Sequence, residues 1–209
     1  MLSTSSEIGV IGSGAMGLGI AQTASAAGHK VRLYDNNADA LLKAKNNLQS
    51  GLSKLVEKQK LSEASAKTLF ENITFENDLS KFKNCDLIIE AIVENLQIKK
   101  SVFQELEKIV NAECVLASNT SSLSITSISS ACKQAGRVIG IHFFNPATLM
   151  PLVEIIPGLA TEKHVIDSSR KLIDGWKKVT VLAKDTPGFI VNRVARPYYS
   201  EALRIYEEG

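Results

Sequence analysis

The segment that decides the fold is Ile8-Gly9-Val10-Ile11-Gly12-Ser13-Gly14-Ala15-Met16-Gly17, near the start of a chain of 209 residues. Ile8–Ile11 is a short apolar run of the kind that forms a buried strand. Residues 16–27 have a helical pattern, which Gly28 ends. A strand, a glycine-rich turn and a helix in this order predict the beginning of a β-α-β unit.

The turn has the pattern GxGxxG in the structural context that this motif requires. Gly12 permits the tight turn, Gly14 lets the backbone approach a pyrophosphate, and Gly17 allows the helix to pack closely on the strand. The helix N-terminus also offers unpaired N–H groups to phosphates. We therefore expect the loop to bind a dinucleotide through Gly12, Ser13, Gly14, Ala15, Met16 and Gly17. A glycine-rich turn without a ligand is the alternative.

Asp35 ends the second predicted strand, at residues 31–35, roughly 20 residues beyond the motif. A carboxylate at that place can accept hydrogen bonds from the adenine ribose, and it would repel a 2′-phosphate. The following residues, Asn36 and Asn37, supply no arginine that could bind such a phosphate. The sequence therefore favours NAD over NADP as the cofactor.

The rest of the chain predicts an α/β fold with a Rossmann-like, doubly wound and mostly parallel sheet. An amphipathic helix with apolar residues from Leu41 to Leu55 and a second helix at residues 62–71 predict an inserted helical hairpin. A final helix at residues 189–208 has an apolar stripe and predicts a C-terminal linking helix. Two parts are expected, a catalytic domain at 1–186 and, at 187–209, the first helix of a further helical domain. The later strands are predicted at Leu87–Ile92, Cys114–Ser118, Val138–Phe143, Leu152–Ile156 and Val179–Ala183.

Composition excludes several other functions. The formal net charge of +2 gives no electrostatic reason to expect nucleic acid as a partner. No apolar run is long enough for a membrane span, and the first residues resemble no signal peptide, so we expect no membrane contact and a cytoplasmic location. The three cysteines, Cys85, Cys114 and Cys132, form no metal-binding pair, and we expect no metal.

One of the three histidines is a candidate catalytic base. His29 follows Gly28 in a loop and His164 lies at the polar start of a helix, so both are expected on the surface. His142 instead ends an apolar strand, and ligands in such sheets gather at the carboxyl ends of strands. A histidine at that place is structural about as often as it is catalytic.

Glu154 favours the catalytic interpretation of His142. It interrupts the apolar strand Leu152–Ile156, where an unpaired carboxylate would be costly. A short connection through Pro146 and Pro151 separates this strand from that of His142, so hairpin pairing could bring the two side chains together. The carboxylate would then orient the imidazole and stabilise its protonated form. A glutamate on an edge strand that points into water is the alternative.

Two further polar residues are candidates for binding the reacting oxygen. The run at residues 118–122 lies between a strand and a helix, where Ser122 suits the N-cap and leaves Ser121 free to face a ligand. Asn192 lies on the apolar stripe of the last helix, which suggests a buried hydrogen bond. Exposure to solvent is the alternative for Asn192.

Taken together, the motifs resemble those of the 3-hydroxyacyl-CoA dehydrogenase family. The resemblance covers essentially the whole chain in order and is most specific in the last two segments. It rests on Gly12–Gly17, Asp35, the run at 90–95 (EAIVEN), the run at 118–122 (SNTSS), His142–Pro146 and the run at 185–193 (DTPGFIVNR).

The resemblance implies an NAD-dependent dehydrogenase that oxidises an (S)-3-hydroxyacyl-CoA to the 3-oxoacyl-CoA. Fatty-acid β-oxidation, butyrate-type metabolism and aromatic-acid degradation all stay open as its pathway. It implies His142 as general base, Glu154 as its partner, and Ser121 and Asn192 as ligands of the reacting oxygen. The implied NAD contacts are Asp35, Glu94, Lys99, Ser121 and Asn145, and the implied coenzyme A contacts are Ser121 and Lys58.

The assignment of Lys58 has an equally plain alternative, a solvated lysine beside Lys54 and Lys60. Relatives continue into a helical domain that forms a homodimer and closes over the substrate, and this chain contains only the linking helix of it. Two other functions stay open at this point: a dehydrogenase of 3-hydroxy acids without coenzyme A, and an NAD-binding protein without catalysis.

Overall fold

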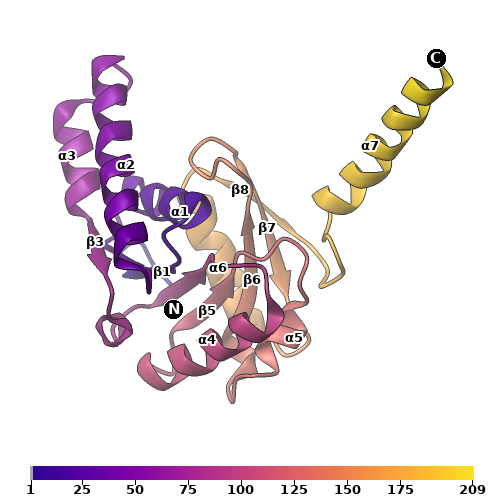
Figure 1. Ribbon diagram of the computed structural model, residues 1–209. Coiled ribbons are helices and arrows are strands. Elements are labelled where there is room, and N and C mark those ends of the chain that lie inside the picture. Colours follow the sequence, from indigo (N-terminus) through magenta and orange to yellow (C-terminus); the bar gives the residue numbers. More distant parts are fainter. Residues whose placement is uncertain (1) are drawn as a thin grey trace.

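The computed structural model describes residues 2–209 as one sheet with helices on both faces (Figure 1). The order of the strands in the sheet is β3-β2-β1-β4-β5-β6-β7-β8. This order reverses between β1 and β4, and ligands of such sheets bind at this reversal, outside the carboxyl ends of the strands. The expected Rossmann-like fold is confirmed. The strands are β1 (Ile8–Ile11), β2 (Val31–Tyr34), β3 (Ile73–Glu76), β4 (Leu87–Glu90), β5 (Val115–Ser118), β6 (Val138–Phe143), β7 (Leu152–Pro157) and β8 (Val179–Leu182).

The sheet is parallel except where β6 and β7 form an antiparallel hairpin. The hairpin register places His142 directly opposite Glu154. Because directly opposite residues of an antiparallel pair point to the same face, this register brings the two side chains together. The hairpin pairing expected from the sequence is confirmed.

Each face of the sheet has its own apolar core. One core packs the sheet against α1 (Ala15–Ala26), α2 (Ala38–Glu57), α3 (Glu63–Glu71) and α6 (Lys163–Gly175). The other core packs it against α4 (Leu96–Ile109), α5 (Ile125–Ser129) and the short helix η1 (Leu79–Phe82). Adjacent residues of a strand serve opposite cores, as Ile88 and Ile89 do, which explains why most strand positions are apolar instead of alternating with polar ones.

The inserted helical hairpin consists of α2 and α3, which lie side by side in Figure 1. Asn37 caps α2 and Ser62 caps α3, each by accepting hydrogen bonds from N–H groups of the first turn. The buried residues of α2 are spaced by three and four positions, which is why the helix buries one face only. They are Leu41, Ala44, Leu48 and Leu52.

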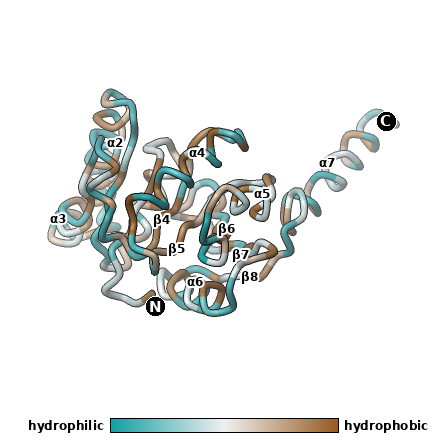
Figure 2. Tube along the Cα trace, turned by 90° about the horizontal axis from the view of Figure 1, so that it is seen from below, coloured by the Kyte–Doolittle hydropathy of each residue, from teal (hydrophilic) through white to brown (hydrophobic). Residues whose placement is uncertain are grey.

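The last helix, α7 (Val191–Glu208), projects away from the rest of the molecule (Figures 1 and 2). None of its side chains is buried. Its exposed large apolar and aromatic residues are Val194, Tyr198, Tyr199, Leu203, Ile205 and Tyr206. Among residues 2–209 there is no helix with the length and apolar character needed to cross a membrane.

Some boundaries differ from those expected. The sequence pattern does not predict β3. It predicts that the last helix begins at Phe189, two residues before the observed start, but Phe189 has a φ of 49° and precedes the helix. It also extends β4 to Ile92, whereas the strand ends at Glu90. A polar side chain inside the apolar run, Glu90, therefore marks the true end of the strand.

The surface position expected for His29 is wrong. Its side chain is buried, its Nδ1 lies 2.8 Å from the carbonyl oxygen of Ser6, and its ring packs against Trp176. A tryptophan distant in sequence covers a loop that looks exposed by its composition. His164 is exposed, as expected.

Candidate active site

The glycine-rich loop between β1 and α1 has the conformation that the motif predicts. Gly12 has a φ of 102°, which side-chain-bearing residues rarely adopt. A Cβ atom on Gly17 would lie 1.8 Å from the carbonyl oxygen of Gly12. Both glycines are therefore required by the protein's own backbone.

Gly14 is different, because the folded chain alone does not require it. Its φ of −61° suits any residue, and a Cβ atom there would meet nothing within 4 Å. No side chain caps the N-terminus of α1, so the first N–H groups of this helix are free to face a ligand. An open space beside free N–H groups fits the pyrophosphate of a dinucleotide.

Asp35 lies beside the glycine-rich loop, at the edge of the open space next to Gly14. Its Oδ2 accepts hydrogen bonds from the backbone N–H (2.8 Å) and the hydroxyl (2.7 Å) of Ser13, and its Oδ1 accepts one from the N–H of Asn37. Burial by itself would raise the pKa of the Asp35 carboxyl, but these hydrogen bonds hold the pKa below its usual range. The carboxylate is thus charged at neutral pH, as the discrimination against a 2′-phosphate requires.

A cavity of about 530 Å³, a volume typical of small-molecule sites, opens between these elements. It is lined by Gly12, Gly14 and Asp35 on one side and by the loop after β4 on the other. It lies at the reversal in strand order between β1 and β4, where dinucleotides bind in this fold. The residues present therefore fit NAD.

Replacing Gly14 by alanine should affect NADH binding, whereas replacing Gly17 by alanine should affect stability. Gly14→Ala is expected to leave stability unchanged and to weaken NADH binding about tenfold or more, because the methyl group enters the ligand's space. Gly17→Ala is expected to lower the free energy of unfolding by about 1–3 kcal/mol, because its Cβ meets backbone. Urea denaturation and fluorescence titration with NADH measure both; equal NADH affinity in Gly14→Ala and the parent contradicts a phosphate at this loop.

His142 and Glu154 form a buried pair at the carboxyl end of β6. The Nδ1 of His142 lies 2.7 Å from Oε2 of Glu154, and the two residues are 5% and 0% exposed. The other carboxylate oxygen, Oε1, accepts the N–H groups of Ile190 and Val191, each at 2.9 Å. Glu154 thus joins the histidine to the N-terminus of α7.

The surroundings of this pair keep the carboxylate ionised. Burial alone would raise the pKa of Glu154, but the hydrogen bonds from His142, Val191 and Ile190 hold that pKa below its usual range. The rings of Phe144 and Phe189 pack against the imidazole, with centroids 4.5 and 5.8 Å away. Since Nδ1 is bonded to the carboxylate, Nε2 is the nitrogen left for exchanging a proton with a ligand.

Ser121 and Asn192 come together although they are distant in sequence. The side-chain amide of Asn192 donates to the carbonyl oxygen of Ser121 at 3.4 Å. Asn192 is half-buried in the first turn of α7, so the buried role expected for it is only partly met. The neighbouring Asn119 accepts the N–H of Phe143 at 2.8 Å, which ties the Ser121 loop to the strand of His142.

The expected N-cap at Ser122 is wrong. The helix after this loop, α5, begins later and is capped by Ser124, whose hydroxyl accepts the N–H of Ser127. The N–H of Ser122 instead reaches the hydroxyl of Thr120 at 3.4 Å. Several serines in succession make the cap position ambiguous in the sequence, and the structure resolves it.

Asp185, in the connector before α7, stabilises the N-terminus of α5. Its carboxylate accepts hydrogen bonds from the hydroxyl of Ser124 and from the N–H groups of Ile125 and Thr126, at 2.8–2.9 Å. Burial alone would raise the pKa of Asp185, but hydrogen bonds from Thr126, Ile125 and Ser124 hold it below the usual range. The connector is thus fixed to the helix that follows the Ser121 loop.

Asp185→Asn is expected to lower the free energy of unfolding by about 1–3 kcal/mol at neutral pH, because two N–H groups lose a charged acceptor. Because its pKa is lowered in the folded protein, Asp185 stabilises the fold fully at pH values above the pKa of an unperturbed aspartate, about 3.9. This contribution is lost as the pH falls through the lowered pKa. The difference between parent and variant should therefore shrink in acid. Urea denaturation between neutral pH and pH ~2 measures it; a constant difference contradicts the assignment.

Two predicted site residues, Asn145 and Lys58, have exposed side chains. Asn145 is exposed in the loop between β6 and β7, and Lys58 is exposed at the end of α2. Neither makes a hydrogen bond with the other predicted site residues. Their contacts with NAD and coenzyme A stay predictions.

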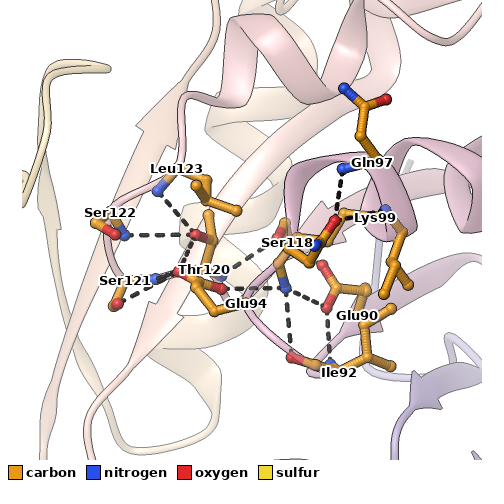
Figure 3. A network of polar contacts seen from close by, with 12 residues as sticks. Glu90, Ile92, Glu94, Gln97, Lys99, Ser118, Thr120, Ser121, Ser122 and Leu123 are labelled. Carbon is orange, nitrogen blue, oxygen red and sulfur yellow. Dashed lines mark hydrogen bonds and ion pairs between the residues drawn. The ribbon is translucent and has the colours of Figure 1, made fainter.

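Lys99 occupies a position that the sequence does not reveal. Its side chain is 1% exposed, and its Nζ lies 2.6 Å from Oε1 of the fully buried Glu90 and 3.3 Å from Oε2 of Glu94 (Figure 3). Glu90 also accepts the hydroxyl of Ser118 at 2.7 Å. The buried Glu90 was visible in the sequence only as a break in an apolar run.

Glu94 faces the Ser121 loop. Its Oε1 accepts the hydroxyl of Thr120 at 2.6 Å and the N–H of Ser121 at 3.0 Å (Figure 3). Burial alone would raise the pKa of Glu94, but the bond from Thr120, the charge of Lys99 and the N–H of Ser121 hold that pKa below the usual range. Glu94 and Ser121, both predicted NAD contacts, are therefore brought together.

Comparisons with known proteins show the family of this chain. Residues 7–186 match the family model for the NAD-binding domain of 3-hydroxyacyl-CoA dehydrogenase. The chain is 44% identical to a 3-hydroxyadipyl-CoA dehydrogenase of Escherichia coli, over 96% of this chain and 42% of that protein. It is 42% identical to a 3-hydroxybutyryl-CoA dehydrogenase of Clostridioides difficile, over 97% of this chain and 72% of that protein.

A solved structure gives the same result. The crystal structure of a 3-hydroxybutyryl-CoA dehydrogenase from Escherichia coli superposes with a TM-score of 0.95 at 44% identity, over 98% of this chain and 43% of that one. The chain thus spans less than half the length of its Escherichia coli relatives. NAD as the cofactor and an NAD-dependent oxidoreductase family are confirmed. The chain belongs to the 3-hydroxyacyl-CoA dehydrogenase family, whose NAD-binding domain it contains.

Proposed function

We propose that this chain supplies the NAD-binding and catalytic residues of an enzyme that oxidises (S)-3-hydroxyacyl-CoA to 3-oxoacyl-CoA. The main support is the buried hydrogen bond between His142 and Glu154. It joins a base to the carboxylate that orients it, at the ligand-binding end of the sheet. The names of the relatives support the substrate class. A fatty-acid β-oxidation role is consistent with that class.

In this proposal His142 is the general base. Glu154 holds its Nδ1, so Nε2 takes the proton of the substrate's 3-hydroxyl group. The carboxylate then offsets the positive charge that the imidazole gains. Bound NAD supplies the acceptor for the hydride that leaves carbon 3 of the substrate. Loss of the proton and of the hydride together leaves a carbonyl group at carbon 3.

Ser121 and Asn192 hold the reacting oxygen in this proposal. The side-chain amide of Asn192 donates to the backbone carbonyl oxygen of Ser121, so the Asn192 amide and the Ser121 hydroxyl belong to neighbouring residues of two different elements. Both groups can donate a hydrogen bond to an oxygen that gains negative charge as the proton leaves. In the reverse direction the same donors polarise the ketone.

We also propose that α7 is the first element of a helical domain through which a homodimer forms. Its many exposed tyrosine and aliphatic side chains form an apolar surface of the kind that packs against another part of a protein. The lengths of the relatives support a further domain, because this chain spans 42% to 72% of them. Sedimentation of a longer form of the protein and of this chain tests the proposal: a dimer only in the longer form supports it.

The reaction is tested by adding NADH and acetoacetyl-CoA to the purified chain and following the loss of NADH absorbance. Consumption supports the proposed reaction class and assigns the chemistry to residues 1–209. If the chain is inactive, a longer form that contains it is tested in the same assay. Turnover of free acetoacetate at the same rate as the thioester would favour a dehydrogenase without coenzyme A, and NADH binding without any turnover would favour a non-catalytic protein.

A further inference from the structure

The loop between β6 and β7 joins the two strands of the proposed catalytic pair, and few of its side chains could fix it in place. Among residues 145–150 only Ala147 is buried. Inside this segment the carbonyl oxygen of Pro146 accepts the N–H groups of Leu149 and Met150, each at 3.0 Å, which closes a turn. A single buried alanine contributes little apolar contact, so the position of the turn must depend on contacts of its backbone.

Lys178, which directly precedes β8, makes those contacts. Its Nζ donates to the carbonyl oxygen of Ala147 at 2.6 Å and to that of Met150 at 2.9 Å, and both carbonyl groups belong to the turn. The hydroxyl of Thr23 also reaches the Ala147 oxygen, but only at 3.4 Å. One ammonium group therefore makes the two short hydrogen bonds that attach the turn to the sheet.

A lysine at this position is costly, and its cost needs a reason. Lys178 is 8% exposed. Burial lowers the pKa of Lys178, and no charged neighbour among residues 2–209 opposes that shift. An apolar side chain would fill the same space without burying a charge. Only a donor-bearing side chain, however, can bind two carbonyl groups of one turn at once.

Asn145 is the residue whose position depends most on this turn. It directly precedes Pro146, its side chain is exposed, and it is a predicted NAD contact. On the side of β6, the N–H of Phe143 is fixed by the side chain of Asn119 at 2.8 Å. On the other side the backbone is fixed by Lys178. The two attachments enclose Asn145 at the carboxyl end of β6.

We propose that Lys178 is a positioning residue that fixes the turn at 146–150 and, through this turn, places Asn145 for contact with bound NAD. The proposal rests on the proposed function in that NAD is bound at this end of the sheet. A lysine that served stability alone would change the free energy of unfolding but not the NADH affinity of the folded protein. Coupling between Lys178 and Asn145 is therefore the property to measure.

The test is a double-mutant cycle on the Kd for NADH, with Lys178→Met, Asn145→Ala and the variant that carries both substitutions. Methionine removes the N–H donors and the charge while it keeps most of the side-chain length. Lys177→Met changes the adjacent, exposed lysine and is the matched control. Amide hydrogen exchange at residues 147–150, without coenzyme, reports on the turn itself. All measurements are made below the melting temperature of each variant.

In Lys178→Met we expect exchange in the turn to be about tenfold faster and the Kd for NADH to rise about five- to tenfold. Asn145→Ala should raise the Kd about tenfold and leave exchange in the turn unchanged. The double variant should bind NADH about as weakly as Asn145→Ala, because no contact is then left for Lys178 to position. The control should match the parent in both measurements.

Three outcomes would overturn the proposal. A parental Kd in Lys178→Met would make this lysine purely structural. Effects that multiply in the double variant, to about 50- to 100-fold, would show that Lys178 acts independently of Asn145. A parental Kd in Asn145→Ala would remove the contact that is to be positioned.

If Lys178→Met does not fold, Lys178→Gln supplies the same readouts, because its shorter side chain cannot reach both carbonyl groups. None of these measurements uses a substrate. Failure of the proposed reaction would therefore be recognised separately, in the turnover assay with acetoacetyl-CoA.

Discussion

Replacing His142 by alanine is expected to lower kcat about 10²- to 10⁴-fold, which is the range for loss of a general base. The imidazole is the only proton acceptor that Glu154 orients, and its Nε2 is the nitrogen left for the substrate. NADH should bind nearly as tightly as to the parent, because the glycine loop and Asp35 lie on other strands. The assay is loss of NADH absorbance with acetoacetyl-CoA, in whichever form of the protein is active.

His164→Ala is the matched control, since it also removes a histidine but one that is exposed in α6. It should have the kcat and the NADH affinity of the parent. Near-normal turnover by His142→Ala would remove His142 from the chemistry. A large loss of NADH affinity in that variant would instead mean that the substitution had disturbed the coenzyme site.

The coenzyme site could be predicted closely from the sequence because its determinants are local. The strand, the glycines and the helix follow one another within residues 8–26, and the close approach that requires Gly17 is to the carbonyl oxygen of Gly12 in the same segment. Asp35 lies at the end of the adjacent strand, and parallel pairing of β1 with β2 brings it back to the loop. The glycine loop and Asp35 therefore need only the β-α-β unit to come together.

The pairing of His142 with Glu154 was also predictable, because it depends on one hairpin. Each residue was conspicuous as a polar side chain in an apolar strand, and antiparallel pairing across a short connection placed them opposite one another. Neither the two N–H groups at the start of α7 nor the packing of Phe189 on the imidazole could be predicted in this way. Those contacts depend on where a distant connector crosses the sheet.

The buried cluster of Glu90 and Lys99 was missed for a related reason. Lys99 lies at the end of the first turn of α4, near the capping residue Asn95, and a lysine near a helix end is ordinarily solvated. Its burial depends on the loop after β4 and on the Ser118 strand end, which close over it from two other elements. β3 was missed because Ile73–Glu76 is a short edge strand with a single buried residue, Ile73.

Glu154→Gln tests the second half of the proposed catalytic pair. Glutamine has nearly the same shape and can still accept the N–H groups of Ile190 and Val191, but it carries no charge. The imidazole would then lose the anion that stabilises its protonated form and the acceptor that fixes its orientation. We expect kcat to fall roughly 10²- to 10⁴-fold, as for loss of the carboxylate in a histidine–aspartate pair.

The structural consequence of Glu154→Gln should be smaller than its effect on kcat. Removing a charged acceptor from buried hydrogen bonds costs about 1–3 kcal/mol, and urea denaturation measures this cost beside the kinetics. The exposed Glu113→Gln is the control and should change neither quantity. If the variant unfolded more easily but retained its kcat at a temperature where it is fully folded, Glu154 would be a residue that attaches α7 to the sheet. Because one carboxylate contacts both the imidazole and the helix, only separate measurements of kcat and unfolding can assign its role.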